Sequence, residues 1–413
     1  MSVNTAELNG DDAALKDRDS GAGLEPLSPE ALERLRNFSP PNKAVQVCKA
    51  LAVFGALVFV CGAMFNAERA WSGMLLVGNY LVGLALAGLL FIALQYVSGA
   101  GWSVALRRIP EAMTTLLPAG VGAIALVLVF YSTLYGDETF TGFKGLWLGR
   151  GFSLVRTVLY IAIWLYFIRA ILQHSREQDA DGAPIHTRHN VRLSAIFIVL
   201  FALTYWLASV DWIMSLEPHW YSTIFGIYNF SGLFTSGLAC IILLAAWLRH
   251  QGCLRGLVTD DQFHDLGKLL LAFTTFWAYI WFSQYMLIWY ANIPEETVYF
   301  ITRTRGVWGS LFIINFALNW VLPFFVLLPR ENKRNTGIMV KVAIVVLVGR
   351  WLDLYLMIFP ATDQASPVFG IWEIGITAGA GGLFGLLIFR ALRQAPLIPL
   401  KDPHLHESLH HHQ

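Results

Sequence analysis

The apolar residues of this chain fall into ten long runs that alternate with short polar segments. Each run reaches about 20 residues, the length that an α-helix needs to cross the hydrocarbon core of a bilayer. Membrane β-strands do not fit, because they are about half as long and alternate apolar with polar positions. The pattern predicts an all-α membrane protein with helices near residues 44–65, 74–98, 115–134, 153–173, 191–212, 224–248, 267–290, 307–328, 338–360 and 369–392.

Polar residues prevail at both ends of the chain. Residues 1–43 hold no apolar stretch typical of a cleavable signal peptide, and we expect a mostly disordered tail with one short helix from Ser28. Residues 44–395 are expected to form the membrane domain. Residues 396–413 form a second polar tail, and we interpret its last stretch, HESLHHHQ, as flexible, although it offers adventitious metal ligands.

Composition and charge agree with a membrane protein and predict its orientation. Of the 413 residues 56% are hydrophobic and 14% charged, whereas soluble domains carry roughly 25% charged residues. The net charge of +1 gives no sign of the strongly basic surface that nucleic-acid-binding proteins carry. With the N-terminus inside, the inner segments hold sixteen Lys and Arg and the outer loops five. Because positively charged loops stay in the cytoplasm, we expect both termini there.

Two opposite charges lie deep inside the ninth apolar run. Arg350 and Asp353 fall about 18 and 22 Å along a helix that begins near residue 338, too far from its start to reach water easily. They are three residues apart, so they share one helix face and can pair. One interpretation is a structural ion pair that fixes helix packing. The other is a proton-relay station in which Asp353 titrates under the control of Arg350.

Further ionisable residues gather at the predicted outer surface. Asp211, Glu217 and His219 lie at and after the end of the fifth run, and Glu373 lies near the start of the tenth. Carboxylates and a histidine at a membrane surface can pass protons between water and the interior. Taken singly, each of them is more typical of an ordinary polar loop or a helix cap.

The seventh run carries polar groups across the bilayer. Tyr279 and Gln284 lie within it, and His264 and Lys268 mark its cytoplasmic end. Such groups can hold a chain of waters, but hydrogen bonds between helices are an alternative. Lys268 is also typical of an anchor at the membrane surface.

The remaining motifs exclude several kinds of chemistry. None of the eleven histidines lies inside an apolar run, so a haem held between membrane helices has no axial ligands. The four cysteines form no CxxC spacing, and the chain has no P-loop, no GxGxxG after a strand and no HExxH. We therefore expect no catalytic signature and no redox cofactor or metal in this chain. The glycine-rich stretch GITAGAGGLFG, residues 375–385, lies in a predicted span and predicts close helix packing.

Four stretches resemble one family. They are ALRRIPEAM (105–113), DWIMSLEPHWYSTIFGIYNFSG (211–232), FSQYMLIWYANIPEE (282–296) and RWLDLYLMIFP (350–360). They are similar to the polysulfide-reductase-type (NrfD-like) membrane subunits of bacterial alternative complex III, a quinol:electron acceptor oxidoreductase. The chain resembles the F subunit of that complex more than the longer C subunit, over about residues 44–395.

The resemblance implies a fold, partners and a role. The expected fold is two four-helix bundles with two flanking helices, in the bacterial inner (cytoplasmic) membrane. Expected partners are the homologous C subunit, an iron–sulfur subunit, c-type haem subunits, small membrane subunits and a terminal cytochrome c oxidase. The iron–sulfur clusters and haem c would lie in those partners. This chain would carry no redox cofactor and would contribute a proton pathway coupled to quinol oxidation, with Arg350 and Asp353 at its centre.

Other interpretations stay open at the level of sequence. The chain could be a purely structural scaffold of that complex, or a quinone-binding subunit whose Trp and Tyr line a slot. Ten membrane helices alone would also permit a stand-alone secondary transporter.

Overall fold

The computed structural model describes residues 33, 35, 36, 38–130, 134–136, 140–362 and 366–411. Within these residues the chain is α-helical without strands, and ten helices are long and apolar enough to cross a membrane. The all-α membrane fold is therefore confirmed. The expectations for residues 1–32, a disordered tail with a short helix at Ser28, lie outside the described residues.

Several membrane spans are built from more than one helical segment. The third combines α5, η3 and α6, and the eighth combines α14, the π-helical segment η5 and α15. The membrane elements are α3 (Asn42–Phe65), α4 (Ala67–Ser98), α5 (Arg108–Met113), η3 (Thr114–Leu116), α6 (Leu117–Val129), α9 (Arg150–Asp181), α10 (Pro184–Trp212), α11 (Phe225–His250), α12 (Asp260–Ala291), α14 (Gly306–Phe316), η5 (Ala317–Val321), α15 (Leu322–Leu327), α17 (Thr336–Ile358) and α18 (Ile371–Leu392).

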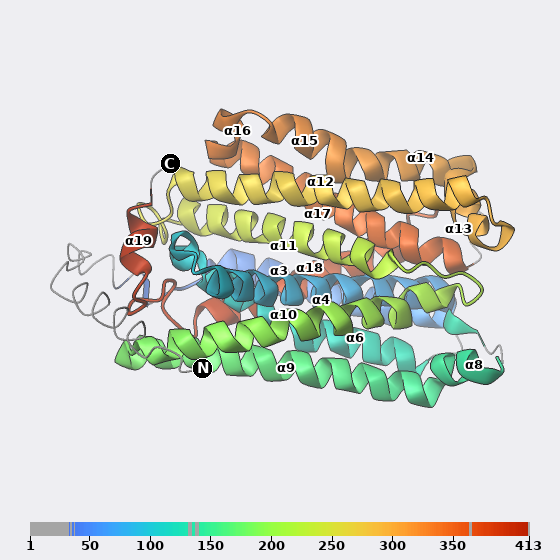
Figure 1. The fold of residues 1–413 in the computed structure, drawn as a ribbon, viewed down its shortest axis with the longest axis horizontal. Coiled ribbons are helices and arrows are strands. Elements are labelled where there is room, and N and C mark those ends of the chain that lie inside the picture. Colours follow the sequence, from blue (N-terminus) through green and yellow to red (C-terminus); the bar gives the residue numbers. More distant parts are fainter. Residues whose placement is uncertain are drawn as a thin grey trace, which may run out of the picture.

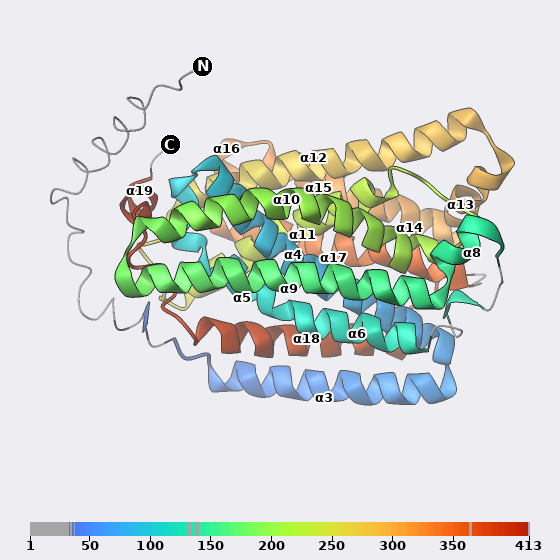
Figure 2. The same cartoon turned by 60° about the horizontal axis from the view of Figure 1, so that its bottom comes forward.

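The spans form two groups of four around a shared centre. In the first, α4 packs against α6 and α10, and α10 packs against α9; in the second, α11 packs against α12 and α17, and the eighth span packs against α12 and α17. The helices α4 and α11 contact each other and are almost wholly buried. The first and last spans, α3 and α18, pair along one side of the first group (Figure 2).

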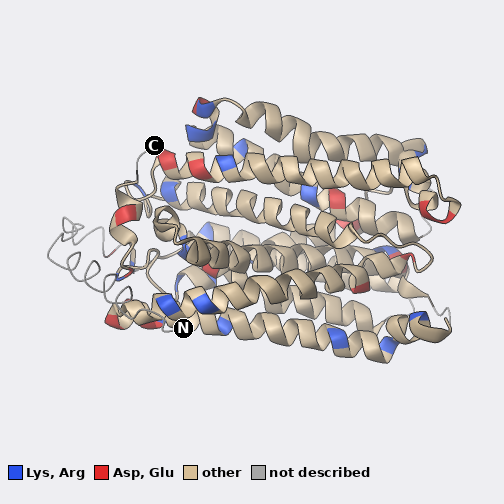
Figure 3. Cartoon of the chain, viewed as in Figure 1, with Lys and Arg blue, Asp and Glu red and all other residues tan. Residues whose placement is uncertain are grey.

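The helices run roughly parallel along one long axis, so the molecule has two ends (Figure 1). We call the end that holds the α9–α10 turn and α19 (Leu405–Leu409) the terminal end. The opposite, distal end carries the short helices α8 (Gly142–Leu148) and α13 (Pro294–Thr304). Charged residues concentrate at both ends, and the middle is mostly uncharged (Figure 3).

Some helix limits differ from the prediction for a physical reason. The third span begins at Arg108 and not near 115, because α5 carries charged residues that are buried inside the protein. The fourth span continues to Asp181 instead of ending near 173, since its last two turns are polar and project beyond the apolar run. Hydropathy alone detects neither extension.

The C-terminal segment is folded against the terminal end and is not the flexible tail expected from its sequence. Leu397 donates a backbone hydrogen bond to Leu35, and Asp402 pairs with Arg107. Ser408 donates to the carbonyl of Trp102 at 2.8 Å. The described part of this tail therefore joins the α4–α5 connection, η2 (Gly101–Leu106), to the rest of the molecule.

The glycine-rich stretch of α18 makes the close packing that its sequence predicts. A methyl group at Gly379 would lie 2.6 Å from the Cα of Gly55 in α3, closer than any real contact. The backbones of α3 and α18 thus touch where both helices lack side chains.

Candidate functional site

A carboxylate with four hydrogen-bond donors lies at the centre of the second helix group. Asp353 in α17 is wholly buried, and its Oδ2 accepts from Arg350 Nη1 at 2.7 Å and from Trp277 Nε1 at 3.3 Å. Its Oδ1 accepts from Asn315 Nδ2 at 3.1 Å and from the hydroxyl of Tyr228. The predicted pairing of Arg350 with Asp353 is therefore confirmed, and helices α11, α12 and α14 supply the other donors.

The guanidinium of Arg350 extends the cluster towards the first helix group. It donates to the side-chain oxygen of Asn229, whose amide donates to Ser209 Oγ at 2.9 Å. A side chain at Gly232 would collide with the guanidinium, so this glycine makes room for the charge. The hydroxyl of Tyr205 lies close enough to interact with the charge of Arg350. Arg350 thus connects α17 with α10 and α11.

Local structure in the eighth span orients one of these donors. Asn319 lies in the π-helical segment η5 and donates to Asn315 Oδ1 at 2.8 Å, which turns the Asn315 amide nitrogen towards the carboxylate. Single π-helical turns are rare and often occur at functional sites. Close packing helps to hold Asn319 in place, since a methyl group at Gly349 would lie 2.9 Å from its oxygen.

A small cavity lies between the cluster and α13 at the distal end, and a few polar side chains interrupt its mostly apolar wall. It measures about 20 Å³ and is lined in part by Tyr228, Gln284, Arg303 and Asn315. About 10–15 Å³ is enough for one water when polar partners surround it. On its far side Arg303 donates to Glu217, whose side chain is partly exposed. Few hydrogen-bonding groups therefore separate Asp353 from the distal surface.

Arg303 is also a fixed structural element. Its guanidinium donates to the carbonyls of Leu356 at 2.8 Å and Met357 at 3.2 Å, near the end of α17. It lies 3.5 Å from the ring centre of Tyr299, and burial raises the pKa of that tyrosine to about 12. Tyr299 therefore stays protonated at neutral pH, and the permanent charge beside Glu217 is that of Arg303.

Two other predicted acids form closed ion pairs at the distal end. Asp211 receives Nε and Nη2 of Arg156 at 2.9 and 2.8 Å and the hydroxyl of Tyr160 at 3.0 Å. Glu373 receives Nε and Nη2 of Arg69 at 2.8 and 2.7 Å and also caps α18. Both carboxylates are buried but are not connected with Asp353 by any described contact, so they fasten α9 to α10 and α4 to α18.

The residues of α12 that were predicted to form a proton pathway lie at different depths and on different faces of the helix. Gln284 is buried beside the small cavity and donates to Ser222 at 3.1 Å. Tyr279 is 65% exposed on the outer surface, away from the cluster. At the terminal end His264 is buried, and Lys268 pairs with Asp265 at 2.6 Å. The side chains of α12 therefore form no continuous polar line across the membrane.

His219 lies on the distal surface. It is exposed, and its ring packs edge-on against Phe140 at 5.7 Å. It follows Glu217 by two residues but faces water, so it does not belong to the buried cluster.

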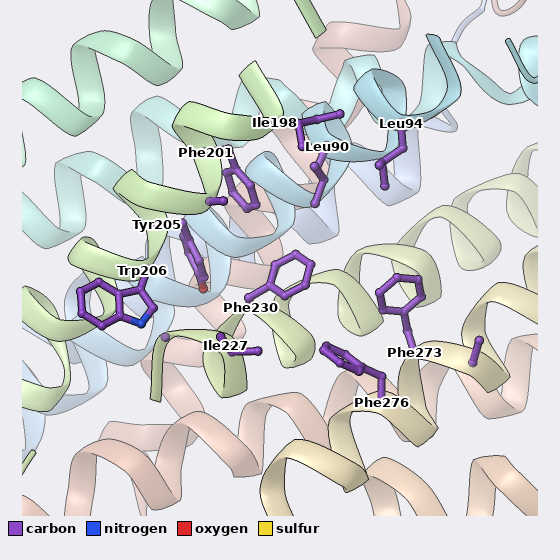
Figure 4. Close-up of a pocket in the computed structure, with 13 residues that line it drawn as sticks. Leu90, Leu94, Ile198, Phe201, Tyr205, Trp206, Ile227, Phe230, Phe273 and Phe276 are labelled. Carbon is purple, nitrogen blue, oxygen red and sulfur yellow. The ribbon is translucent and has the colours of Figure 1, made fainter. Parts of the chain in front are cut away.

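An apolar cavity opens between the two helix groups near the Arg350 cluster. It measures about 580 Å³, and rings of Phe201, Phe230, Phe273 and Phe276 surround it (Figure 4). Tyr205, which also interacts with Arg350, brings a hydroxyl group to the cavity wall. The lining holds no acid or base and fits an acyl or isoprenoid chain better than a reacting group.

Sequence reasoning missed several residues of the cluster. Asn229 and Asn315 lie inside apolar runs, and their amides were the available signal. Arg303 counts as a loop charge in the sequence, although it is almost wholly buried. A second buried group, at the terminal end, joins Arg108 to Glu111 and Asp179. The charges in ALRRIPEAM were its signal, but only the fold brings α9 beside them.

Comparison with known proteins identifies no family for this chain. No protein-family model matches it, and no curated protein matches it.

Proposed function

We propose that this chain is a proton-conducting membrane subunit of a respiratory quinol-oxidising complex of the alternative complex III type. It would carry no redox cofactor of its own. Iron–sulfur and c-type haem subunits, with a homologous membrane subunit, would perform the electron transfer. The four sequence stretches that resemble this family support the choice of complex.

The observation that carries the proposal is the buried carboxylate of Asp353. A charge so deep in a membrane protein is costly and usually functional. The small cavity and the Arg303–Glu217 pair support a short route from this carboxylate to the distal surface. Along such a route the proton would pass between Asp353 and Glu217 through the Tyr228 hydroxyl and water, while the amides of Gln284 and Asn315 and the charge of Arg303 would orient that water.

Along α11 the described hydroxyls do not continue the route towards the terminal end. Towards the terminal end of α11, the hydroxyls of Ser231, Thr235 and Ser236 donate to carbonyls of their own helix. They are therefore engaged and do not continue the chain of donors. This favours a half-channel that opens to the distal side.

We further propose that the distal side faces the periplasm of a bacterial inner membrane. Lys and Arg are more numerous in the segments of the terminal end, which favours the cytoplasm for that end. Protons passing through the half-channel would then be released outside.

The test is proton release by the assembled complex in vesicles. For Asp353→Asn we expect electron transfer to continue while the protons released per electron decrease. Asp260→Asn, at an exposed position of the terminal end, is the matched control. An unchanged proton-to-electron ratio in Asp353→Asn would remove this residue from the mechanism. Absence of co-purifying c-type haem would refute membership in the complex.

A structural scaffold is the second candidate, favoured by the four donors that already satisfy Asp353. On this alternative Asp353→Asn would impair assembly. Glu217→Gln distinguishes the two, because it leaves the central pair intact. A conducting route predicts slower proton release in this variant, whereas a scaffold predicts an unchanged rate of proton release.

A further inference from the structure

The polar hairpin between α9 and α10 brings three potential metal ligands together. His174 and Glu177 lie in the last turns of α9, and His186 lies in the first turn of α10 beyond the turn at Gly182. All three side chains are partly buried. Glu177 Oε2 lies 3.1 Å from His174 Nδ1 and 3.4 Å from His186 Nδ1, and the two Nδ1 atoms are 3.5 Å apart.

These three distances match the edges of a metal coordination shell. Zinc binds nitrogen and carboxylate oxygen at about 2.0–2.2 Å in tetrahedral geometry, which separates neighbouring ligand atoms by roughly 3.3 Å. The three atoms therefore form a nearly regular triangle of the right size. A fourth, open position would be filled by water.

Neighbouring side chains orient two of the ligands for this role. Gln173 donates to Glu177 Oε1 at 2.8 Å, which leaves Oε2 to face the histidines. His186 Nε2 lies 3.0 Å from Asp181 Oδ2. A carboxylate on the far nitrogen of a histidine ligand is the usual support in metal sites, because it fixes the ring and makes the bound nitrogen more basic.

One tautomer of His186 favours a positive charge at the centre of the three atoms. If His186 donates its Nε2 proton to Asp181, a neutral ring presents a lone pair at Nδ1. That lone pair faces the carboxylate of Glu177 and lies next to Nδ1 of His174. A cation between the three atoms removes this repulsion. Two imidazoles with one carboxylate favour a transition metal over magnesium or calcium.

We propose that His174, Glu177 and His186 bind one divalent transition-metal ion, with Zn²⁺ as the fitting species, and that the ion fastens α9 to α10 at the terminal end. The site is separate from the proton route and does not depend on the proposed function. Its role is to hold the helical hairpin closed beyond the membrane.

The test uses the purified full chain in detergent. Metal-free protein is titrated with Zn²⁺ against a chromophoric chelator, and bound zinc is counted by mass spectrometry. His186→Gln and Glu177→Gln should each lose one zinc relative to the unsubstituted chain. Zinc should raise the melting temperature of the unsubstituted chain and not that of the two variants.

Two controls separate this site from other histidines. His189→Gln changes the histidine next to His174 and should keep the zinc. His406→Gln/His410→Gln removes a stacked pair in the C-terminal segment and should also keep it. The proposal fails if His186→Gln binds as much zinc as the unsubstituted chain. It also fails if metal-free protein takes up none, which would leave a protonated ion-pair network in its place.

Discussion

Asp353 combines a buried charge with a full set of hydrogen bonds. Its partners come from four helices, so the carboxylate stabilises the packing of the second helix group as well as offering a proton site. A buried ion pair contributes little by itself, because desolvation offsets the attraction, but the loss of one partner is costly. The two charges should therefore be strongly coupled in stability.

Removing Arg350 alone tests this coupling. Arg350→Met should lower the free energy of unfolding by about 3–5 kcal/mol, because the buried carboxyl group of Asp353 loses its partner. The double variant Arg350→Met/Asp353→Leu should lose less than Arg350→Met. The measurement is unfolding of the purified chain in mixed detergent micelles.

The control is Arg169→Met, at an exposed position of α9, which should change stability by no more than about 0.5 kcal/mol. The coupling would be contradicted if the double variant lost as much free energy of unfolding as Arg350→Met and Asp353→Leu lose together.

For single residues, the sequence predicts the pairing of Arg350 with Asp353 but not the donors that other helices bring to them. The spacing of Arg350 and Asp353 places them on one helix face, whatever the neighbouring helices are. The approach of Tyr228 and Trp277 depends on how α11 and α12 pack, which a single sequence does not specify. For the same reason the sequence groups His219 with Glu217 by proximity along the chain, whereas the fold separates them by burial.

Among the elements, α3 is joined to the molecule mainly through α18. Their contact depends on glycines, because side chains at the crossing would keep the backbones apart. Where lipid surrounds both helices, close packing supplies much of the association energy.

Adding one methyl group tests this contact. Gly379→Ala should destabilise the α3–α18 pair by about 1–3 kcal/mol, because the new Cβ overlaps the backbone of α3. Gly381→Ala is the matched control: the same helix has open space there, and alanine is about 1 kcal/mol better than glycine in a helix. Thermal unfolding in detergent compares the two. A Gly379→Ala variant as stable as Gly381→Ala would show that the contact is not tight.

Apolar runs predict the ten spans because burial in lipid demands length and hydrophobicity, and the structure confirms them. The same criterion misses α5, whose buried Arg108 pairs with Glu111 and with Asp179 of α9. It also misses α8 and α13, which lie at the distal end and are too short to span.

For the whole molecule, the terminal end carries the larger share of Lys and Arg, and this bias should set the orientation. In a bacterial host, alkaline phosphatase fused after Phe140, at the distal end, should be active because it is exported. The same enzyme fused after Gly182, at the terminal end, should be inactive. The reverse pattern would invert the orientation and place the half-channel on the cytoplasmic side.

The pairing of the first membrane helix with the last also has a consequence for biosynthesis. As the ribosome delivers the spans in order, α3 enters the membrane first but cannot meet its main partner until α18 follows. Its glycine face must wait in lipid, or beside the insertion machinery, while all the intervening helices are made. A chain truncated before α18 would leave the glycine face of α3 uncovered. Membrane quality-control proteases could recognise this uncovered face and so distinguish incomplete chains from complete ones.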